Sequence, residues 1–222
     1  TLCPNAQESQ TGSGAGINCD SLISGCSHGT HVSGIAAGSS ATINGVAKDA
    51  GIIAVQIFSR FDDAAYCDGS PPCILSWTSD QMEALEHVYS FRTTYNIAAV
   101  NMSLGGGKYT SYCDTASQKA AIDNLRTAGI ATVIASGNDG YCDGISSPAC
   151  ISTAVSVGAT TKSDAETYYN NYHPTLMTLF APGSSIYSSV PGGWGYKSGT
   201  SMAAPHVTGA WALLKQKKSS AS

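Results

Sequence analysis

The chain has 222 residues, of which only 12% are charged, and its formal net charge is −4. This length suits one domain of ordinary size with a substantial core. The acidic balance excludes the basic footprint of a nucleic-acid-binding protein, and no apolar run approaches the roughly 18 residues of a membrane span. Few charges with abundant Gly, Ser, Thr and Ala favour a compact, loop-rich extracellular protein, which we expect to be a monomer.

The first 27 residues are rich in Gly, Ser, Asn and Gln and show no apolar periodicity. We expect an irregular surface segment there, held by Cys3, Cys19 and Cys26. The start lacks the basic residues and apolar core of a signal peptide. The small residues of the next segment, 27–38, predict a closely packed helix that ends at Gly38.

The eight cysteines form no Cys-x-x-Cys pair, so a metal framework is not indicated. An even number of cysteines in a chain with few charges favours disulfides and an oxidising compartment, and the alternative is buried free thiols in a cytosolic protein. Cys67 and Cys73 flank a short Pro-rich loop and are expected to pair. Cys142 and Cys150 are expected to form a second short loop, although spacing alone does not fix this connectivity.

Strands alternate with helices along the rest of the chain. Short apolar runs predict buried strands over residues 51–58, 97–102, 130–135 and 155–158. This alternation predicts an α/β fold with a mostly parallel sheet covered by helices on both faces. In such sheets the chemistry gathers at the carboxyl ends of the strands, where Gly-rich turns follow Met102 and Ala135.

Three helices are predicted beyond the first. One begins at Ser79 or Asp80, and its buried face carries Met82, Leu85, Val88 and Tyr89. The next spans residues 116–127, points Ala121, Leu125 and Ala128 inward, and ends at Gly129. The last follows Ser201 and tolerates Pro205 in its first turns.

Three side chains combine into a possible catalytic set. Ser201 lies at a helix N-terminus, where the dipole favours developing negative charge, so it is a candidate nucleophile if a base can reach it. His28 has the side chain of a general base near neutral pH, and the Asn138 amide could donate to an oxyanion. Taken singly, each also has a structural explanation, as a helix cap, a hydrogen-bonded histidine or a turn residue.

Four segments in one order resemble the subtilisin-like serine proteases, or subtilases: Ser27–Val32, Asn101–Gly105, Ala135–Asn138 and Gly199–His206. The resemblance runs from about Ser27 to the end of the chain. Residues 1–26 resemble the Cys-bearing insertions of some secreted bacterial members. The resemblance implies a subtilisin-like three-layer fold, with a mostly parallel sheet between helices.

The resemblance also implies roles for individual residues. It makes Ser201 the nucleophile of an acyl-enzyme, His28 its general base, and Asn138 with the Ser201 backbone N–H the oxyanion hole. His31 becomes a structural neighbour, and the alternative of a His-x-x-His metal pair lacks evident further ligands. Two segments are implied to pair with an extended substrate: Ser103, Leu104 and Gly105, and Ala135, Ser136 and Gly137.

The resemblance implies no cofactor for the chemistry. Structural calcium is common in the family, but the isolated acidic residues Asp62, Asp63 and Asp139 show no ligand pattern, so no calcium site is assigned. Pro148 and Ala149 are expected near the walls of the specificity pocket, and the residue at its floor is left open.

The family's catalytic Asp is missing from this sequence. The family places it at the end of a first apolar strand before Thr-Gly or Ser-Gly, and neither motif occurs here. Asp20 is the nearest upstream acid that could orient His28. Few residues follow the Ser201 helix. We therefore expect residues 1–222 to be a partial catalytic domain, truncated at both ends, whose partner is an upstream segment that supplies the Asp.

The expected function is that of a secreted serine endopeptidase acting on proteins or peptides. The alternative is a catalytically impaired fragment or pseudoprotease that binds peptides or serves a structural role. An esterase of the α/β-hydrolase class fits poorly, because that class uses Gly-x-Ser-x-Gly with its His after the Ser. Here His28 precedes Ser201, while His206 follows closely on the same helix and is expected to face away from the hydroxyl.

Overall fold

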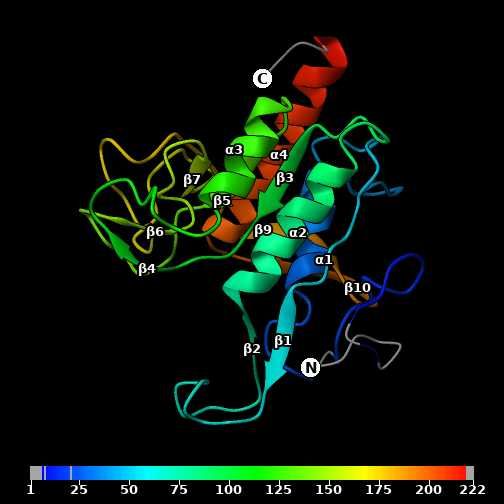
Figure 1. The fold of residues 1–222 in the computed structure, drawn as a ribbon. Helices are drawn as coiled ribbons and strands as arrows, with labels where there is room; N and C mark the ends of the chain where they lie inside the picture. Colours follow the sequence, from blue (N-terminus) through cyan, green and yellow to red (C-terminus); the bar gives the residue numbers. More distant parts are fainter. Residues whose placement is uncertain (1–6, 8, 21, 219–222) are drawn as a thin grey trace.

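The computed structural model describes residues 7, 9–20 and 22–218. Figure 1 shows three layers with a parallel sheet in the middle. The sheet has the strand order β3-β5-β7-β8, and all three pairings are parallel. Its strands are β3 (Ala99–Met102), β5 (Ala131–Ala135), β7 (Val155–Thr160) and β8 (Leu179–Pro182). The expected α/β fold with a mostly parallel sheet is confirmed.

Helices cover both faces of this sheet (Figure 1). Helices α2 (Thr78–Ser90) and α3 (Lys119–Thr127) lie on one face, and α1 (His28–Ala37) and α4 (Thr200–Lys217) lie on the other. The side chains of the central strand β5 show why both faces need a covering layer. Its Ile134 packs into the cluster of α2 and α3, whereas Val133 packs into the cluster of α4, because successive strand residues point to opposite faces. A strand that is buried on both faces therefore has a continuous apolar run in its sequence.

Three antiparallel pairs surround the sheet, and the sequence did not predict them as pairs. They are β1 (Phe58–Phe61) with β2 (Cys73–Ser76), β4 (Gly106–Tyr109) with β6 (Ile145–Ser147), and β9 (Ile186–Val190) with β10 (Gly193–Lys197). These strands are three to five residues long. Several are rich in Gly or Ser, so the alternating apolar pattern of a longer half-buried strand is weak in them.

The helix predictions hold, with local corrections. Helix α2 begins at Thr78, so Ser79 and Asp80 lie in its first turn instead of capping it. Helix α3 begins at Lys119 instead of residue 116, and it ends before Gly129 as expected, where φ is +73°. Its Ala128 is exposed, and Ile122 is the buried residue that the sequence interpretation missed.

The expected buried strand over residues 51–58 is wrong. Residues 51–57 form no strand, and Phe58 is the first residue of β1. The side chains of Ile52 and Ile53 are 49% and 46% exposed. The physical reason is the lack of a neighbour: among the described residues, no backbone group of residues 51–57 forms a backbone hydrogen bond. An apolar run becomes a buried strand only when a ladder satisfies its N–H and C=O groups.

The disulfides confirm one expected pair and correct another. Cys67 and Cys73 are bonded, but Cys150 pairs with Cys113, while Cys142 is exposed and free. The fold brings the two backbones together, since the Cys113 N–H donates to the Cys150 carbonyl at 3.0 Å and the two Cα atoms are 5.3 Å apart.

The N-terminal segment contains a third disulfide, between Cys19 and Cys26. The described residues before Ser27 form neither helix nor strand, in agreement with an irregular segment. Cys3 lies outside the described residues.

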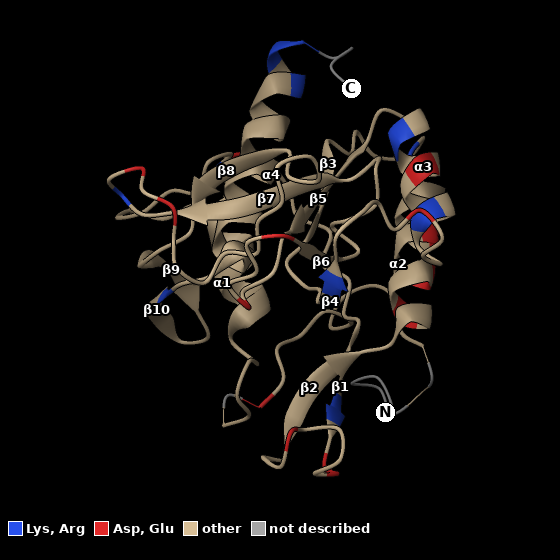
Figure 2. Cartoon of the chain, turned by 90° about the vertical axis from the view of Figure 1, so that its left-hand side faces the viewer, with Lys and Arg blue, Asp and Glu red and all other residues tan. Residues whose placement is uncertain are grey.

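Charged residues are sparse and concentrated in a few places. Figure 2 shows them mainly on α2 and α3, in the loop between β1 and β2, and at the end of α4. Helix α1 carries none. No described helix is both long enough and apolar enough to cross a membrane.

Candidate active site

The parallel sheet brings distant segments together at one edge. Strand β3 runs directly into Ser103, and β5 runs into Ser136. Because Met102 pairs with Ile134 in register, the turns that follow both strands leave the sheet side by side. Helix α4 begins at the same edge, so Ser201 in its first turn lies beside Ser103.

Ser201 is joined to Ser103 by two hydrogen bonds. The Ser103 hydroxyl donates to the Ser201 carbonyl at 2.7 Å, and the Ser201 hydroxyl donates to the Ser103 carbonyl at 3.3 Å. Helix geometry explains the first bond. The Ser201 carbonyl would normally accept from the N–H four residues later, but that residue is Pro205, which has no N–H. Ser103 therefore satisfies a carbonyl that the helix leaves free.

Asn138 is oriented by Thr200. Both the backbone N–H and the hydroxyl of Thr200 donate to Asn138 Oδ1, at 2.8 and 3.0 Å. With its oxygen fixed in this way, the exposed amide presents Nδ2 as a free donor at the start of α4. The sequence interpretation named Asn138 and missed Thr200, which is buried and orients it.

A cavity of about 240 Å³ lies between these segments. It is lined by Asn138 and Ser201 together with four of the six expected substrate-binding residues, Leu104, Gly105, Ala135 and Gly137. Ser136 and Ser103 do not line it: Ser136 is buried, and the Ser103 hydroxyl is held by Ser201.

The walls of this cavity differ in part from the sequence-based expectation. Ser146 lines it, whereas Pro148 and Ala149 do not, since Ala149 packs into the core of α2 and α3. Ser146 is buried and hydrogen-bonds the Ser136 carbonyl through its N–H at 2.9 Å. No sequence signal distinguishes it from the neighbouring serines.

The turn that carries Asn138 requires glycine at position 137. Gly137 has φ +109°, and a Cβ there would lie 2.1 Å from Asn171 Nδ2 and 2.4 Å from Ser146 Oγ. Asn171 is fully buried, and its Oδ1 accepts from the Asp139 N–H at 2.8 Å. The buried amide of Asn171 therefore holds the turn in place. Asn171 lies in a polar loop, and its sequence context did not indicate this role.

His28 is the first residue of α1 and is half-buried. Its pKa is lowered to about 4, mainly by burial and in smaller part by the positive charges of Lys197 and His31. The imidazole is therefore neutral at neutral pH, as a general base must be. Among the described residues, neither Ser201 nor a carboxylate hydrogen-bonds its ring. Asp20 instead accepts from the Leu22 N–H at 2.9 Å.

The other two histidines near the site serve the structure. His31 is buried, and its Nε2 lies 3.1 Å from both the Ile186 and the Gly195 carbonyls, so it ties α1 to the β9–β10 hairpin. His206 Nδ1 lies 2.8 Å from the Met202 carbonyl on its own helix. Among the described residues, no group of three or more His, Cys, Asp or Glu is placed to hold a metal ion.

Comparison with known proteins places these residues in a family. The model of the subtilase family, Peptidase_S8, matches residues 7–222. Among curated proteins, the chain is 36% identical over 208 residues to the alkaline serine exoprotease A of Vibrio alginolyticus, covering 93% of this chain and 34% of that protein. It is 39% identical over 196 residues to the extracellular serine proteinase of Thermus sp. (strain Rt41A), covering 85% of this chain and 41% of that protein.

The fold is also similar to solved structures. A cold-adapted subtilisin-like serine proteinase superimposes with a TM-score of 0.67 at 35% identity, covering 86% of this chain and 62% of that one. The chain thus spans between about a third and two fifths of the length of the two curated relatives named above.

Proposed function

This chain belongs to the subtilase family, and we propose that it supplies the nucleophile, the general base and the oxyanion donors of a serine endopeptidase. One observation carries the proposal. Ser201, at the N-terminus of α4, and Asn138, whose amide oxygen is fixed by Thr200, line the same small cavity. A pure peptide-binding module would need neither a hydroxyl nor an oriented amide there.

The reaction would be acyl transfer. Ser201 Oγ attacks the carbonyl carbon of the scissile peptide bond while His28 takes its proton. The oxyanion that forms accepts hydrogen bonds from Asn138 Nδ2 and from the Ser201 N–H, since a first-turn N–H has no partner within the helix. His28 then returns the proton to the leaving amine, and water hydrolyses the acyl-enzyme by the same steps. The proposed chemistry uses the protein's own side chains, one backbone N–H and water, and it calls for no cofactor.

Substrate would lie extended along the two turns. Residues 103–105 and 135–137 follow neighbouring strands at one edge. The first segment would pair with the peptide backbone. The second would flank its side chain, since Ala135 and Gly137 line the cavity while the backbone groups of Ser136 and Gly137 are bonded within the protein. The cavity of about 240 Å³ beside Ser201 would then receive the side chain that precedes the cut. Three disulfides fit a secreted protein, and the Thermus relative is named as extracellular.

We propose that two changes are required for the reaction. The Ser201 hydroxyl must turn from the Ser103 carbonyl toward His28. His28 also needs a carboxylate that fixes its tautomer and stabilises the imidazolium. We propose that this carboxylate comes from a segment outside residues 1–222, because Asp20 bonds the backbone next to it instead.

Labelling with a fluorophosphonate probe tests the proposed function. We expect the probe to attach to Ser201, no labelling of Ser201→Ala, and much slower labelling of His28→Ala. Ser111→Ala serves as the control, since Ser111 is exposed and lies outside the cavity beside Ser201. Peptide mapping of the labelled chain identifies the modified residue.

The proposal fails if Ser201 remains unlabelled both in the chain alone and after an aspartate-bearing segment is added in trans. It also fails if His28→Ala is labelled at the unmodified rate. Binding of an extended peptide without any acylation would instead favour the peptide-binding alternative.

A further inference from the structure

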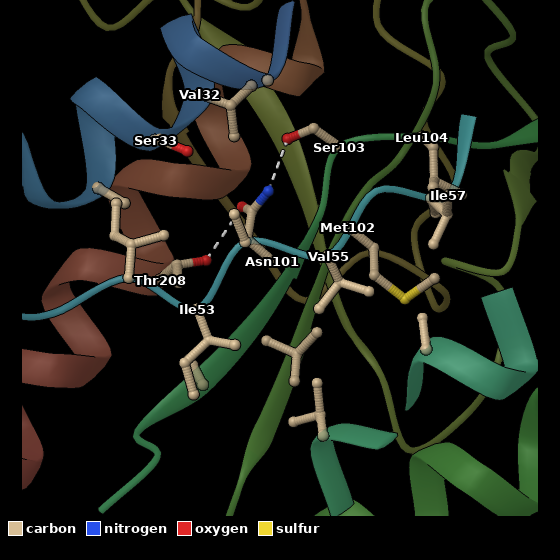
Figure 3. A pocket seen from close by; sticks show the side chains of 18 of the residues that line it. Val32, Ser33, Ile53, Val55, Ile57, Asn101, Met102, Ser103, Leu104 and Thr208 are labelled. Atoms are coloured by element: carbon tan, nitrogen blue, oxygen red, sulfur yellow. Dashed lines mark hydrogen bonds between the residues drawn. The ribbon is translucent and has the colours of Figure 1, made fainter. Parts of the chain in front are cut away.

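Side-chain hydrogen bonds connect the middle of α4 to Ser103 through strand β3. The Thr208 hydroxyl donates to Asn101 Oδ1 at 3.1 Å, and Asn101 Nδ2 donates to the Ser103 hydroxyl oxygen at 2.9 Å. Figure 3 shows both bonds as dashed lines, on the wall of a cavity of about 2100 Å³. The Ser103 hydroxyl in turn donates to the Ser201 carbonyl at 2.7 Å. Thr208, Asn101 and Ser103 thus form a relay that leaves α4 at one residue and returns to it at another.

Strand and helix geometry place the relay on one side of the sheet. Asn101 and Ser103 alternate with Met102, so they project to the face of α4, whereas Met102 packs into the cluster of α2 and α3. On α4, Ser201 and Thr208 are separated by about two turns of helix. Both therefore lie in line on the side of α4 that faces β3.

The direction of each bond in the relay follows from one acceptor. The Ser201 carbonyl can only accept, and Pro205 leaves it without its helix donor, so the Ser103 hydroxyl donates to it. Since its proton is used there, the Ser103 oxygen accepts from Asn101, which must present Nδ2. Asn101 then presents Oδ1 to Thr208, whose hydroxyl must donate. Turning the amide around would set two oxygens against each other or leave the Ser201 carbonyl unpaired, which costs free energy.

The Thr208 hydroxyl has a second possible acceptor, the Ala204 carbonyl on the same helix, also at 3.1 Å. That carbonyl ordinarily accepts from the backbone N–H of residue 208, so it does not depend on the hydroxyl. Among the described residues, no other donor reaches Asn101 Oδ1. The bond to Asn101 is therefore the one for which the hydroxyl is needed.

The relay bears on where Ser201 lies. It contacts α4 at Ser201 and at Thr208, so it fixes how far the start of the helix lies along β3. On the other side of Ser201, Asn138 accepts from Thr200. Reacting groups must be held within about 0.5 Å of the productive geometry, and a displacement of about 1 Å can cost about 10²-fold in rate.

We infer that Thr208 and Asn101 are positioning residues for Ser201: they keep the Ser103 hydroxyl directed at the Ser201 carbonyl and so hold the start of α4 against β3. Neither residue lines the cavity beside Ser201. The expected effect on a reaction rate rests on the proposed function, whereas the expected effect on the start of α4 does not.

Fluorophosphonate labelling of Ser201 at several probe concentrations tests the inference. Thr208→Val keeps the shape of the side chain but removes the hydroxyl. It should lower the labelling rate at saturating probe at least about fivefold, with little change in the half-saturating concentration. Thr208→Ser keeps the hydroxyl and should label within about twofold of the unmodified rate. Thr127→Val is the matched control, since the Thr127 hydroxyl also bonds a carbonyl one turn earlier, but on α3.

A double-mutant comparison shows whether Thr208 acts through Ser103. Ser103→Ala removes the last bond of the relay, so adding Thr208→Val to it should change the labelling rate less than about twofold. Asn101→Ala interrupts the relay at its middle and should slow labelling at least as much as Thr208→Val. Circular dichroism and urea midpoints check that each variant folds, and the two interruptions make the test independent of either one alone.

Hydrogen exchange at the start of α4 gives a readout that needs no reaction. The Met202 N–H donates to the Gly199 carbonyl at 3.0 Å. Its exchange should be at least about threefold faster in Thr208→Val, and unchanged in Thr208→Ser and Thr127→Val. Faster exchange of this amide together with no labelling of even the unmodified chain would refute the proposed function alone.

Three labelling outcomes would overturn the inference. These are equal effects of Thr208→Val with and without the Ser103 hydroxyl, a Thr208→Ser rate as low as that of Thr208→Val, and a change confined to the half-saturating concentration. Labelling of the unmodified chain, with neither the rate nor the Met202 exchange altered in Thr208→Val, would refute the positioning role and leave the proposed function intact.

Discussion

At the residue scale, the site depends on side chains that hold other groups in place. Thr200 fixes the oxygen of Asn138, and Ser103 occupies the carbonyl of Ser201. Neither interaction involves a reacting atom. A hydroxyl or amide donor contributes to catalysis only if it already points at the charge that will develop, so such positioning decides how much an oxyanion hole contributes.

Removing the amide should slow acylation without unfolding the chain. We expect Asn138→Ala to lower the rate of fluorophosphonate labelling about 10²- to 10³-fold, the loss measured for an equivalent donor in subtilisin, itself a member of this family. Thr200→Val should give a smaller loss, because the backbone N–H of residue 200 still holds Asn138. Thr200→Ser keeps the hydroxyl and serves as the control; a loss there as large as in Asn138→Ala would contradict the assigned role.

A single methyl group at position 137 should destabilise the fold. Gly137→Ala forces a left-handed backbone on alanine and places Cβ against Asn171 and Ser146. Strain and overpacking together predict a loss of about 2–5 kcal/mol in the free energy of unfolding, measured by urea denaturation. Gly106→Ala is the matched control, since nothing lies within 4 Å of its Cβ position and its φ is not positive. Equal effects at both positions would refute this explanation.

At the scale of secondary-structure elements, the sequence patterns located the parallel strands and the helices well. A run such as 130–135 is apolar enough to be recognised, and glycines such as Gly129 mark where helices end. The sequence did not predict the β9–β10 hairpin, because the hairpin depends on contacts with residues distant in sequence. These include the contacts of His31 with Ile186 and Gly195. The same limitation explains residues 51–57: their pattern predicts a buried strand, but burial also needs a neighbouring strand that the described chain lacks.

The site likewise contains residues that a local motif predicts and residues whose role depends on distant contacts. The four family segments predicted roles for Ser201, His28 and Asn138, because these residues sit in distinctive short motifs, and the structure places Ser201 and Asn138 at one cavity. Thr200 lies within one of these motifs but was not assigned a role, and Asn171 acts from a loop without one. Cys150 was assigned to the wrong partner because sequence spacing favours near neighbours, whereas the fold brings Cys113 to it.

The disulfide between Cys113 and Cys150 should contribute more to stability than the short one. It closes a separation of 37 residues, against 6 for Cys67 and Cys73. The loop-entropy relation gives about 4 and about 2 kcal/mol for the two. We expect Cys113→Ala/Cys150→Ala to lower the urea midpoint more than Cys67→Ala/Cys73→Ala. Cys142→Ser should leave the midpoint unchanged, and recovery of a Cys142–Cys150 peptide after digestion without reduction would overturn the assignment.

At the scale of the whole molecule, three histidines have lowered pKa values. Burial is the main cause for His28, His31 and His206 alike. The folded chain therefore keeps these imidazoles neutral at pH values where the unfolded chain protonates them. Unfolding then takes up protons, so the free energy of unfolding falls as the pH drops.

This loss should extend from the ordinary histidine pKa near 6.5 down to about 4, the folded-state pKa of His28. Urea midpoints measured at pH 7, 5.5 and 4.5 should decrease in that order, and His206→Gln should make the decrease shallower. Below this range a second loss is expected, because hydrogen bonds from Ser152 lower the pKa of Asp114. A midpoint that stays constant between pH 7 and 4.5 would contradict the account.

Pro205 has a consequence that reaches beyond helix geometry. Because it provides no N–H, the carbonyl of Ser201, the proposed nucleophile, is bonded by Ser103, the first residue of a segment proposed to pair with substrate. The Ser201 hydroxyl in turn rests on the Ser103 carbonyl. Under the proposed function, a peptide paired with residues 103–105 would therefore contact the same residue that holds both oxygen atoms of Ser201.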